Sequence, residues 1–141
     1  MGGEGGGTLV AENGASISSG SLRLYYLLPS PPVRGTGGEA CDAVGCIDLY
    51  AYDPLNRRAA VGIMVANEYR RQGHGLAMLH ALRQLAATTY RLHTLYADIA
   101  APNTASIALF SKAGYAECGH FKEWLEYDSH FIDNIRMQLI L

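Results

Sequence analysis

An apolar segment, residues 59–66 (AAVGIMVA), leads through the sequence NEYRRQGHG into a segment with helical periodicity. A run of this kind is typical of a strand near the centre of a sheet, because both of its faces are covered. Apolar residues then recur at three- and four-residue steps, at Met78, Leu79, Leu82, Leu85 and Ala86. This spacing predicts a helix from about Gly73 to Tyr90. The chain is therefore expected to contain a strand followed directly by a helix, which favours an α/β arrangement.

The turn between this strand and this helix has the composition of an anion site. The first backbone N–H groups of a helix have no internal acceptor, and the helix dipole favours negative charge there. Gly73 and Gly75 let an anion approach the backbone closely, and Arg70 and Arg71 add fork-shaped donors for phosphate oxygens. We predict a diphosphate cradle, although it is neither a P-loop nor the GxGxxG fingerprint. The alternative is a plain turn whose glycines serve packing.

The remaining pattern predicts one domain of mixed α/β (α+β) class. Strands are expected at residues 22–28, 44–52 and 92–100, and a hairpin is expected at 115–141 around Asp128 and Ser129. A second helix is expected between an Asn103 or Thr104 cap and Gly114. We predict a central, mostly antiparallel, twisted sheet with helices packed on it, spanning residues 22–141. Residues 1–21, rich in Gly and Ser, are predicted to be a flexible leader.

Composition argues against several classes of protein. The chain has 141 residues and a net charge of −2. Six arginines lie in residues 57–91, and residues 115–141 carry five acids against two basic residues. We interpret most of these charges as solvated faces. We expect no nucleic-acid partner, because no aromatic platform is interleaved with the arginines, and no membrane partner, because no apolar run is long enough.

Cysteine usage indicates a reducing compartment. The three cysteines, Cys41, Cys46 and Cys118, are an odd number without a CxxC pair, and the histidines show no metal-ligand spacing. We therefore expect reduced thiols, no metal and a cytoplasmic location. The sequence does not define an oligomeric state.

Two motifs and a C-terminal segment resemble a known family. RRQGHGLAMLHAL (70–82) is similar to the R/Q-x-x-G-x-G/A motif of the GNAT superfamily of acyl-CoA-dependent N-acetyltransferases. NTASIALFSKAGY (103–115) resembles the second signature of that superfamily, and residues 117–141 resemble the hairpin of the branch with ribosomal-protein N-terminal and spermidine acetyltransferases. The resemblance covers residues 44–141. It implies a GNAT-like fold and transfer of an acetyl group from acetyl-CoA to a primary amine in a ternary complex, the amine being a polyamine, a peptide N-terminus or another small amine.

The resemblance also implies roles on the acetyl-CoA side. The strand at residues 61–66 would pair with pantetheine, and the Val65 N–H would polarise the thioester carbonyl. Arg70, Arg71, Gly73 and Gly75 would hold the pyrophosphate.

Downstream residues carry further implied roles. Asn103 would bind the pantetheine arm, unless it is a helix cap and nothing more. Lys112 would reach a CoA phosphate, unless it is a solvated lysine. Asp98 would accept the proton of the amine through water, attract the ammonium, or only cap the next turn. Glu68 is a less favoured candidate for the base.

The general acid departs from the family pattern. Many members have a tyrosine seven residues after the motif asparagine, where this chain has Phe110. A phenyl ring donates no proton. Water, Tyr115 or another tyrosine would replace it, or the protein binds CoA with little or no turnover.

The acceptor side is less defined by the sequence. The family's domain begins with a strand and two helices, and we expect these elements to be shortened in this chain, which would leave an open acceptor groove. Trp124, Tyr127 and Phe131 alternate with acidic residues and would suit a cationic amine, unless the hairpin turns its apolar residues to the core. The rival to an enzyme is a non-catalytic CoA-binding module of the same fold.

Overall fold

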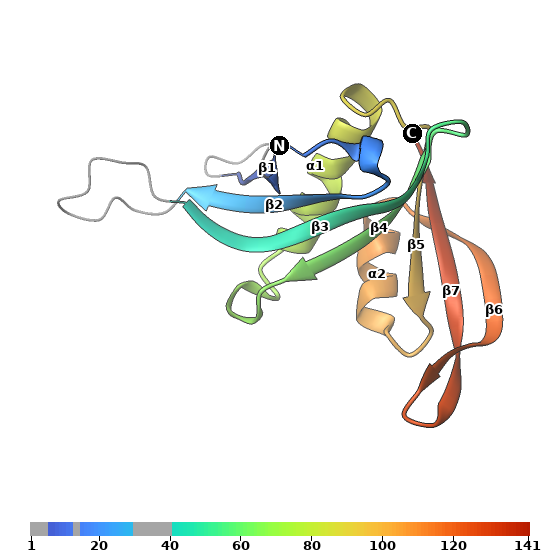
Figure 1. Cartoon of the computed structure of the whole chain (residues 1–141). Coiled ribbons are helices and arrows are strands. Elements are labelled where there is room, and N and C mark those ends of the chain that lie inside the picture. The colour runs from blue at the N-terminus through green and yellow to red at the C-terminus, as the bar shows by residue number, and fades with distance from the viewer. Residues whose placement is uncertain (1–5, 13–14, 30–40) are drawn as a thin grey trace.

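The structure is a computed structural model that describes residues 6–12, 15–29 and 41–141, with the backbone alone for residues 41 and 42. Across these residues the strands form one seven-stranded sheet of order β1-β2-β3-β4-β5-β7-β6 (Figure 1). The strands are β1 (Thr8–Ala11), β2 (Leu22–Pro29), β3 (Cys41–Asp53), β4 (Arg58–Val65), β5 (Thr94–Ala100), β6 (Ala116–Tyr127) and β7 (His130–Ile140). Every neighbouring pair is antiparallel except β4 and β5. The predicted mixed fold with a mostly antiparallel sheet is confirmed.

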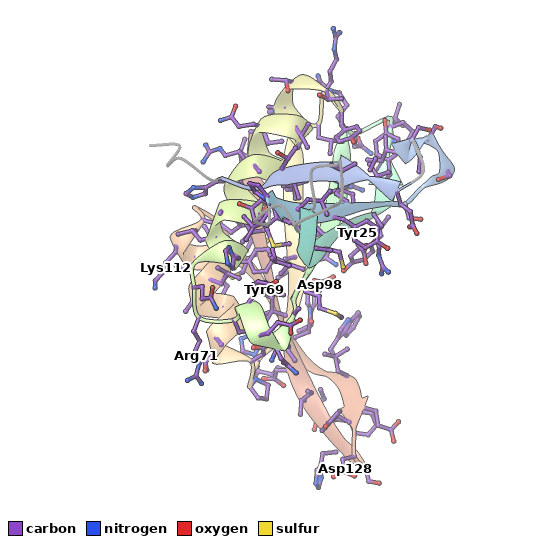
Figure 2. All side chains as sticks on the ribbon, turned by 90° about the vertical axis from the view of Figure 1, so that its left-hand side faces the viewer. Tyr25, Tyr69, Arg71, Asp98, Lys112 and Asp128 are labelled. Carbon is purple, nitrogen blue, oxygen red and sulfur yellow. The ribbon has the colours of Figure 1, made fainter. Side chains whose placement is uncertain are left out.

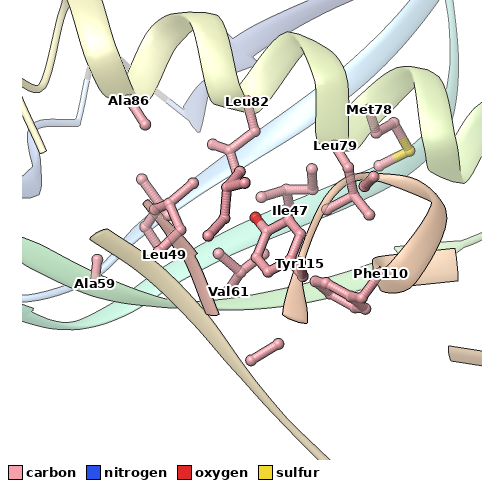
Figure 3. Packing of buried hydrophobic residues seen from close by; sticks show 14 of the residues in the cluster. Ile47, Leu49, Ala59, Val61, Met78, Leu79, Leu82, Ala86, Phe110 and Tyr115 are labelled. Atoms are coloured by element: carbon pink, nitrogen blue, oxygen red, sulfur yellow. The ribbon is translucent and has the colours of Figure 1, made fainter. Parts of the chain in front are cut away.

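Two helices cover one face of this sheet. They are α1 (His74–Thr88) and α2 (Thr104–Lys112), and short 3-10 turns form η2 (Ile17–Ser19) and η3 (Asn67–Tyr69). Met78, Leu79 and Leu82 of α1 are buried against Ile47 and Leu49 of β3 (Figure 3). The helical periodicity thus identified the buried stripe correctly, because residues three and four apart share one side of a helix.

Helix α2 begins and ends as its sequence predicts. The Asn103 side-chain oxygen accepts a hydrogen bond from the Ser106 N–H at 3.2 Å, which caps one of the free amides of the first turn. Gly114 follows the C-cap residue with φ of +96°, a left-handed conformation that glycine adopts without strain.

Residues before β2 differ from the predicted flexible leader. Thr8–Ala11 forms β1 and pairs antiparallel with β2, and Ile17 of η2 is buried in the core. The Gly7 N–H also donates to the Tyr26 hydroxyl at 3.0 Å. The prediction is therefore wrong for residues 7–11 and 17–19, and residues 1–5 and 13–14 lie outside the described part. Composition concealed β1 because an edge strand joins a sheet through backbone hydrogen bonds, which need few large apolar side chains.

The opposite face of the sheet carries polar and exposed side chains, and no helix of the described residues covers it. Arg23 pairs with Asp48 there at 2.7 Å. Tyr50 and Met64 are 39% and 65% exposed, which is high for large residues on inner strands. This face is called the open face below.

The C-terminal hairpin of β6 and β7 extends beyond the N-terminal end of α2 and the loop that joins β5 to α2 (Figure 1). Its turn is formed by Asp128 and Ser129, whose φ angles of +50° and +65° suit a tight hairpin turn. Trp124, Tyr127 and Phe131 are 64%, 72% and 60% exposed. These aromatic residues therefore do not face the core, and the alternative that places them there is wrong.

Candidate active site

Strands β4 and β5 pair at one end and separate at the other. Their parallel pairing covers Arg58↔Thr94 to Ala60↔Tyr96, while β4 continues to Val65 and β5 continues to Ala100 (Figure 1). The facing edges beyond Ala60 therefore leave backbone groups free, because a strand edge without a neighbour has unpaired N–H and C=O groups. This opening is a place where an extended ligand can pair with the sheet.

The backbone of Val65 faces this opening. Val65 lies opposite Gly45 of β3, and the next amide, that of Ala66, donates to the Val44 carbonyl at 2.8 Å. In an antiparallel pair, directly opposed residues alternate between hydrogen-bonded and non-hydrogen-bonded positions. Since residues 66 and 44 are hydrogen-bonded, the N–H and C=O of Val65 point away from β3 and toward the opening.

The turn that follows β4 presents unpaired amides. Arg71 and Gly73 have φ angles of +62° and +82°, and Gly73 caps α1 without a side-chain hydrogen bond. The Ala77 N–H donates to the Gly73 carbonyl at 3.1 Å, and among the described residues no earlier amide of α1 has a backbone acceptor. Successive free amides in such a turn form a concavity suited to an anion.

The two motif glycines, Gly73 and Gly75, are required for different structural reasons. A Cβ on Gly73 would meet nothing within 4 Å, so its left-handed φ is what requires glycine. A Cβ on Gly75 would lie 3.1 Å from Leu109 Cδ2 of α2 and 3.8 Å from Val65 Cγ2. Gly75 therefore permits close packing of α1 against α2, in addition to any role toward a ligand.

The basic side chains near the turn are arranged unequally. Arg70 Nε donates to the Val65 carbonyl at 3.1 Å, whereas the Arg71 guanidinium makes no hydrogen bond within the described part of the chain. Lys112, in the last turn of α2, is exposed and lies with Arg71 on one side of the molecule in Figure 2. Asn103 keeps its side-chain N–H groups unpaired among the described residues, since only its oxygen is used in the cap.

Asp98 is held in an ion pair on the open face. It lies directly opposite Arg136 in the β5–β7 register, and Arg136 Nε and Nη2 donate to its two oxygens at 2.8 and 3.0 Å. Asn134 Nδ2 donates to the same carboxylate at 3.1 Å. The Arg136 hydrogen bonds lower the pKa of Asp98, which partial burial raises to a smaller extent. An ionised carboxylate bound in this way is a weak base.

The sequence did not predict the partners of Asp98. The Arg136 guanidinium lies over the Tyr96 ring at 4.7 Å and over the Phe121 ring at 5.5 Å from the ring centroids. Period-two alternation along 130–141 would have shown that Asn134 and Arg136 share a face. It would not have shown their register against β5, which is set by contacts 36 and 38 residues apart.

Tyr115 is a core residue, and the prediction that it protonates the thiolate is not supported by its position. Tyr115 and Phe110 are each 3% exposed and pack edge to face, with ring centroids 4.9 Å apart (Figure 3). The Tyr115 hydroxyl has no hydrogen-bond partner in the described structure, and burial raises its pKa. The hydroxyl is therefore enclosed in the core and is not presented at the surface of the domain.

A groove of about 370 Å³ lies on the open face beside the paired ends of β4 and β5. It is lined by Asn56, Arg58, Thr94, Tyr96, Arg136 and Gln138. Two of the six lining side chains are cationic, so this groove does not favour an ammonium group. In the described residues, no three or more His, Cys, Asp or Glu side chains are grouped to hold a metal ion. None of the described helices has the length and apolar character needed to cross a membrane.

The fold and sequence match known acetyltransferases. A spermidine N(1)-acetyltransferase of Vibrio cholerae serotype O1 is 24% identical over 97 residues, which are 69% of this chain and 56% of that protein, so the chain spans little more than half the length of this relative. A Vibrio cholerae spermidine N-acetyltransferase chimera with hSSAT matches with a TM-score of 0.75 at 20% identity, covering 87% of this chain and 68% of that one. The Vibrio cholerae enzyme in complex with CoA and spermine matches with a TM-score of 0.74 at 20% identity, over 86% and 66% of the two chains.

The family profile matches a larger continuous part of the domain than either motif. It is described as the acetyltransferase (GNAT) domain and covers residues 19–116, from the 3-10 turn before β2 to the start of β6. The match includes the opening between β4 and β5, the turn of free amides and helix α2. This chain belongs to the acetyltransferase (GNAT) domain family.

Proposed function

We propose that this chain transfers the acetyl group of acetyl-CoA to a primary amine by direct attack in a ternary complex. The observation that supports it best is the opening between β4 and β5, because its β4 wall continues without interruption into the turn of free amides. One side of the site thus offers strand pairing for pantetheine and, a few residues later, an anion site for the pyrophosphate. Membership of the acetyltransferase family supports the same assignment.

On the donor side, each predicted residue has a distinct task. The amides of Arg71, Gly73 and Gly75 bind the pyrophosphate, and the free Arg71 guanidinium adds charge. Asn103 donates an N–H to the pantetheine arm while its oxygen caps α2. Lys112 is exposed and carries a positive charge for a phosphate group.

In the chemical step a neutral amine attacks the thioester carbonyl, and a C–N bond forms. The Val65 N–H donates to the carbonyl oxygen as it becomes an oxyanion. The C–S bond then breaks, and the CoA thiolate takes a proton from water, because Phe110 has none to donate. Asp98 stays the predicted acceptor of the amine proton through water, and its ion pair with Arg136 makes it a weaker base than an isolated carboxylate.

We propose a polyamine as the acceptor. The relatives above act on spermidine by name, and one was solved with spermine. The exposed Trp124, Tyr127 and Phe131 lie on a hairpin that also carries Glu126 and Asp128. Exposed aromatic faces beside carboxylates attract ammonium groups. The cytoplasmic location remains a prediction.

Thiol release tests this proposal directly. The chain is mixed with acetyl-CoA and, separately, with spermidine, spermine, a short peptide and an amino sugar, and free CoA is measured against time. We expect release above the no-amine rate, fastest with the polyamines. Release with the peptide alone would keep acetyl transfer and refute the polyamine assignment.

The second candidate function is a CoA-binding module without turnover. The absence of a usable hydroxyl at both Phe110 and Tyr115 favours it, because neither of these two positions supplies a proton to the thiolate. Calorimetric titration with CoA separates the two candidates. Binding of CoA without thiol release for any amine would support the module, and no binding at millimolar CoA would refute both.

A further inference from the structure

At the end of β4, the backbone N–H and the backbone C=O of Val65 differ in whether they have a hydrogen-bond partner. Both backbone groups of Val65 point to the opening, since Ala66 and Val44 are the hydrogen-bonded pair beside it. The Val65 carbonyl is already occupied, because Arg70 Nε donates to it at 3.1 Å. The Val65 N–H is left as the free backbone group at this point of the strand.

A second side chain of this segment, that of Gln72, also donates to a nearby backbone carbonyl. Gln72 Nε2 donates to the Glu68 carbonyl at 3.1 Å. Arg70 and Gln72 therefore cover the carbonyls of Val65 and Glu68, while the amides of residues 71–76 have no backbone acceptor among the described residues. The segment is built to present donors and to conceal acceptors, which suits a site that binds phosphate oxygens and a developing oxyanion.

We propose that Arg70 is a positioning residue that acts through Val65, and that Arg71 is the arginine that serves the phosphates. The Arg70 Nε–H bond to the Val65 carbonyl, together with the Ala66 N–H bond to the Val44 carbonyl, holds the peptide unit that follows Val65. Through the Cα of Val65 this restricts the orientation of the preceding peptide unit, which carries the Val65 N–H. This inference rests on the proposed acetyl transfer, because the N–H of Val65 is the predicted oxyanion donor. It differs from the direct phosphate contact that the motif implies for Arg70.

A truncated acetyl donor separates the positioning role of Arg70 from a role in phosphate binding. S-acetylpantetheine carries the same thioester as acetyl-CoA but no phosphate group. Arg70→Met is expected to lower kcat about tenfold with either acetyl donor. Complete loss of one oxyanion donor costs about 100-fold or more in kcat, and a misdirected donor is lost only in part. The adjacent Arg71→Met is the matched control. It should raise KM for acetyl-CoA and leave the kinetics with S-acetylpantetheine unchanged.

Affinity for CoA gives the second readout. The Kd of CoA should stay within about threefold of wild type in Arg70→Met, because the turn of free amides is intact. Arg70→Lys keeps the charge but replaces the Nε–H by a flexible ammonium group, so its kcat should lie between those of wild type and Arg70→Met. A loss confined to acetyl-CoA, or a large increase in the Kd of CoA, would overturn the proposal and make Arg70 a phosphate ligand or a general support of the turn.

Nuclear magnetic resonance tests the contact without turnover. The Arg70 Nε–H signal should exchange with water more slowly than that of Arg71, and Arg70→Met should shift the amide signals of Val65 and Ala66. Arg71→Met should leave both signals in place. Equal exchange of the two arginines would refute the positioning contact, whereas slow exchange in a chain that releases no thiol with any amine would refute the proposed function alone.

Discussion

The two sides of the opening between β4 and β5 are built in different ways. Most of the proposed donor side is continuous in sequence: the end of β4, the turn of free amides and the start of α1 lie within residues 65–77 and use mostly backbone groups, and only Asn103 and Lys112 come from α2 and its cap. The acceptor side is assembled from side chains of β5 and β7 that are 36 to 38 residues apart. A local motif therefore specifies the donor side, whereas register between strands specifies the acceptor side.

The largest effect on CoA affinity is expected from a substitution at Gly73, in the turn of free amides. Gly73→Asp directs a carboxylate into the free space over the turn, and two like charges about 4 Å apart repel by about 4 kcal/mol at an effective dielectric constant of 20. We expect the affinity for CoA, measured by calorimetric titration, to fall at least 100-fold. Gly73→Asn is the matched control, because it has the same shape and the same left-handed φ without the charge.

The two Gly73 variants also separate charge from strain. Asparagine tolerates a positive φ better than most residues, so Gly73→Asn should lose less than tenfold in affinity and show a similar melting temperature to Gly73→Asp. Equal affinities for CoA in the two variants would mean that no anion lies over this turn.

The local features around the proposed donor side could be predicted from the sequence because they depend on neighbouring residues. The glycine and arginine positions, the cap at Asn103 and the helical stripe from Met78 to Leu82 all depend on residues close in the chain. The leader was misjudged for the opposite reason, since β1 is stabilised by pairing with β2 that composition does not reveal. Arg136 was missed as the partner of Asp98 because that contact depends on the β5–β7 register.

An intermediate effect is expected on the acceptor side. Asp98→Asn removes the predicted proton acceptor and leaves Arg136 without its bidentate partner. We expect kcat to fall about tenfold, because general bases contribute roughly 100-fold or more and this one is weakened by its ion pair. The Kd of CoA should not change. An unaltered rate and pH profile would show that another group takes the proton.

The same variant reports on stability through pH. The Arg136 hydrogen bonds lower the folded-state pKa of Asp98 below its unfolded value of about 3.9, so this stabilisation is present above pH 4 and is lost as pH falls through the folded pKa. Both side chains are partly exposed, at 31% and 41%, and screening limits the pair to about 1 kcal/mol. Urea unfolding should show this difference from wild type at pH 7, with a smaller difference below pH 4.

A smaller effect is expected from the hairpin. Trp124→Ala removes an exposed aromatic face, worth about 0.5–1 kcal/mol toward an ammonium group at an exposed site. KM for spermidine should rise about threefold, while KM for acetyl-CoA and the melting temperature stay unchanged. Leu55→Ala, at an 88% exposed position outside the hairpin, is the control. Equal KM values for spermidine in both variants would exclude Trp124 from acceptor binding.

The smallest effect is expected at Tyr115, and it concerns stability. An unsatisfied buried hydroxyl costs about 1–3 kcal/mol, and Tyr115 is 3% exposed without a hydrogen-bond partner in the described structure. Tyr115→Phe keeps the ring against Phe110 and should raise the free energy of unfolding in urea by about 1 kcal/mol, with kcat unchanged. A loss of kcat with unchanged stability would return Tyr115 to the acetyl transfer step. Tyr115 belongs to neither side of the opening. A change in stability without a change in kcat would therefore show that packing in the core can vary without affecting acetyl transfer at the strand edges.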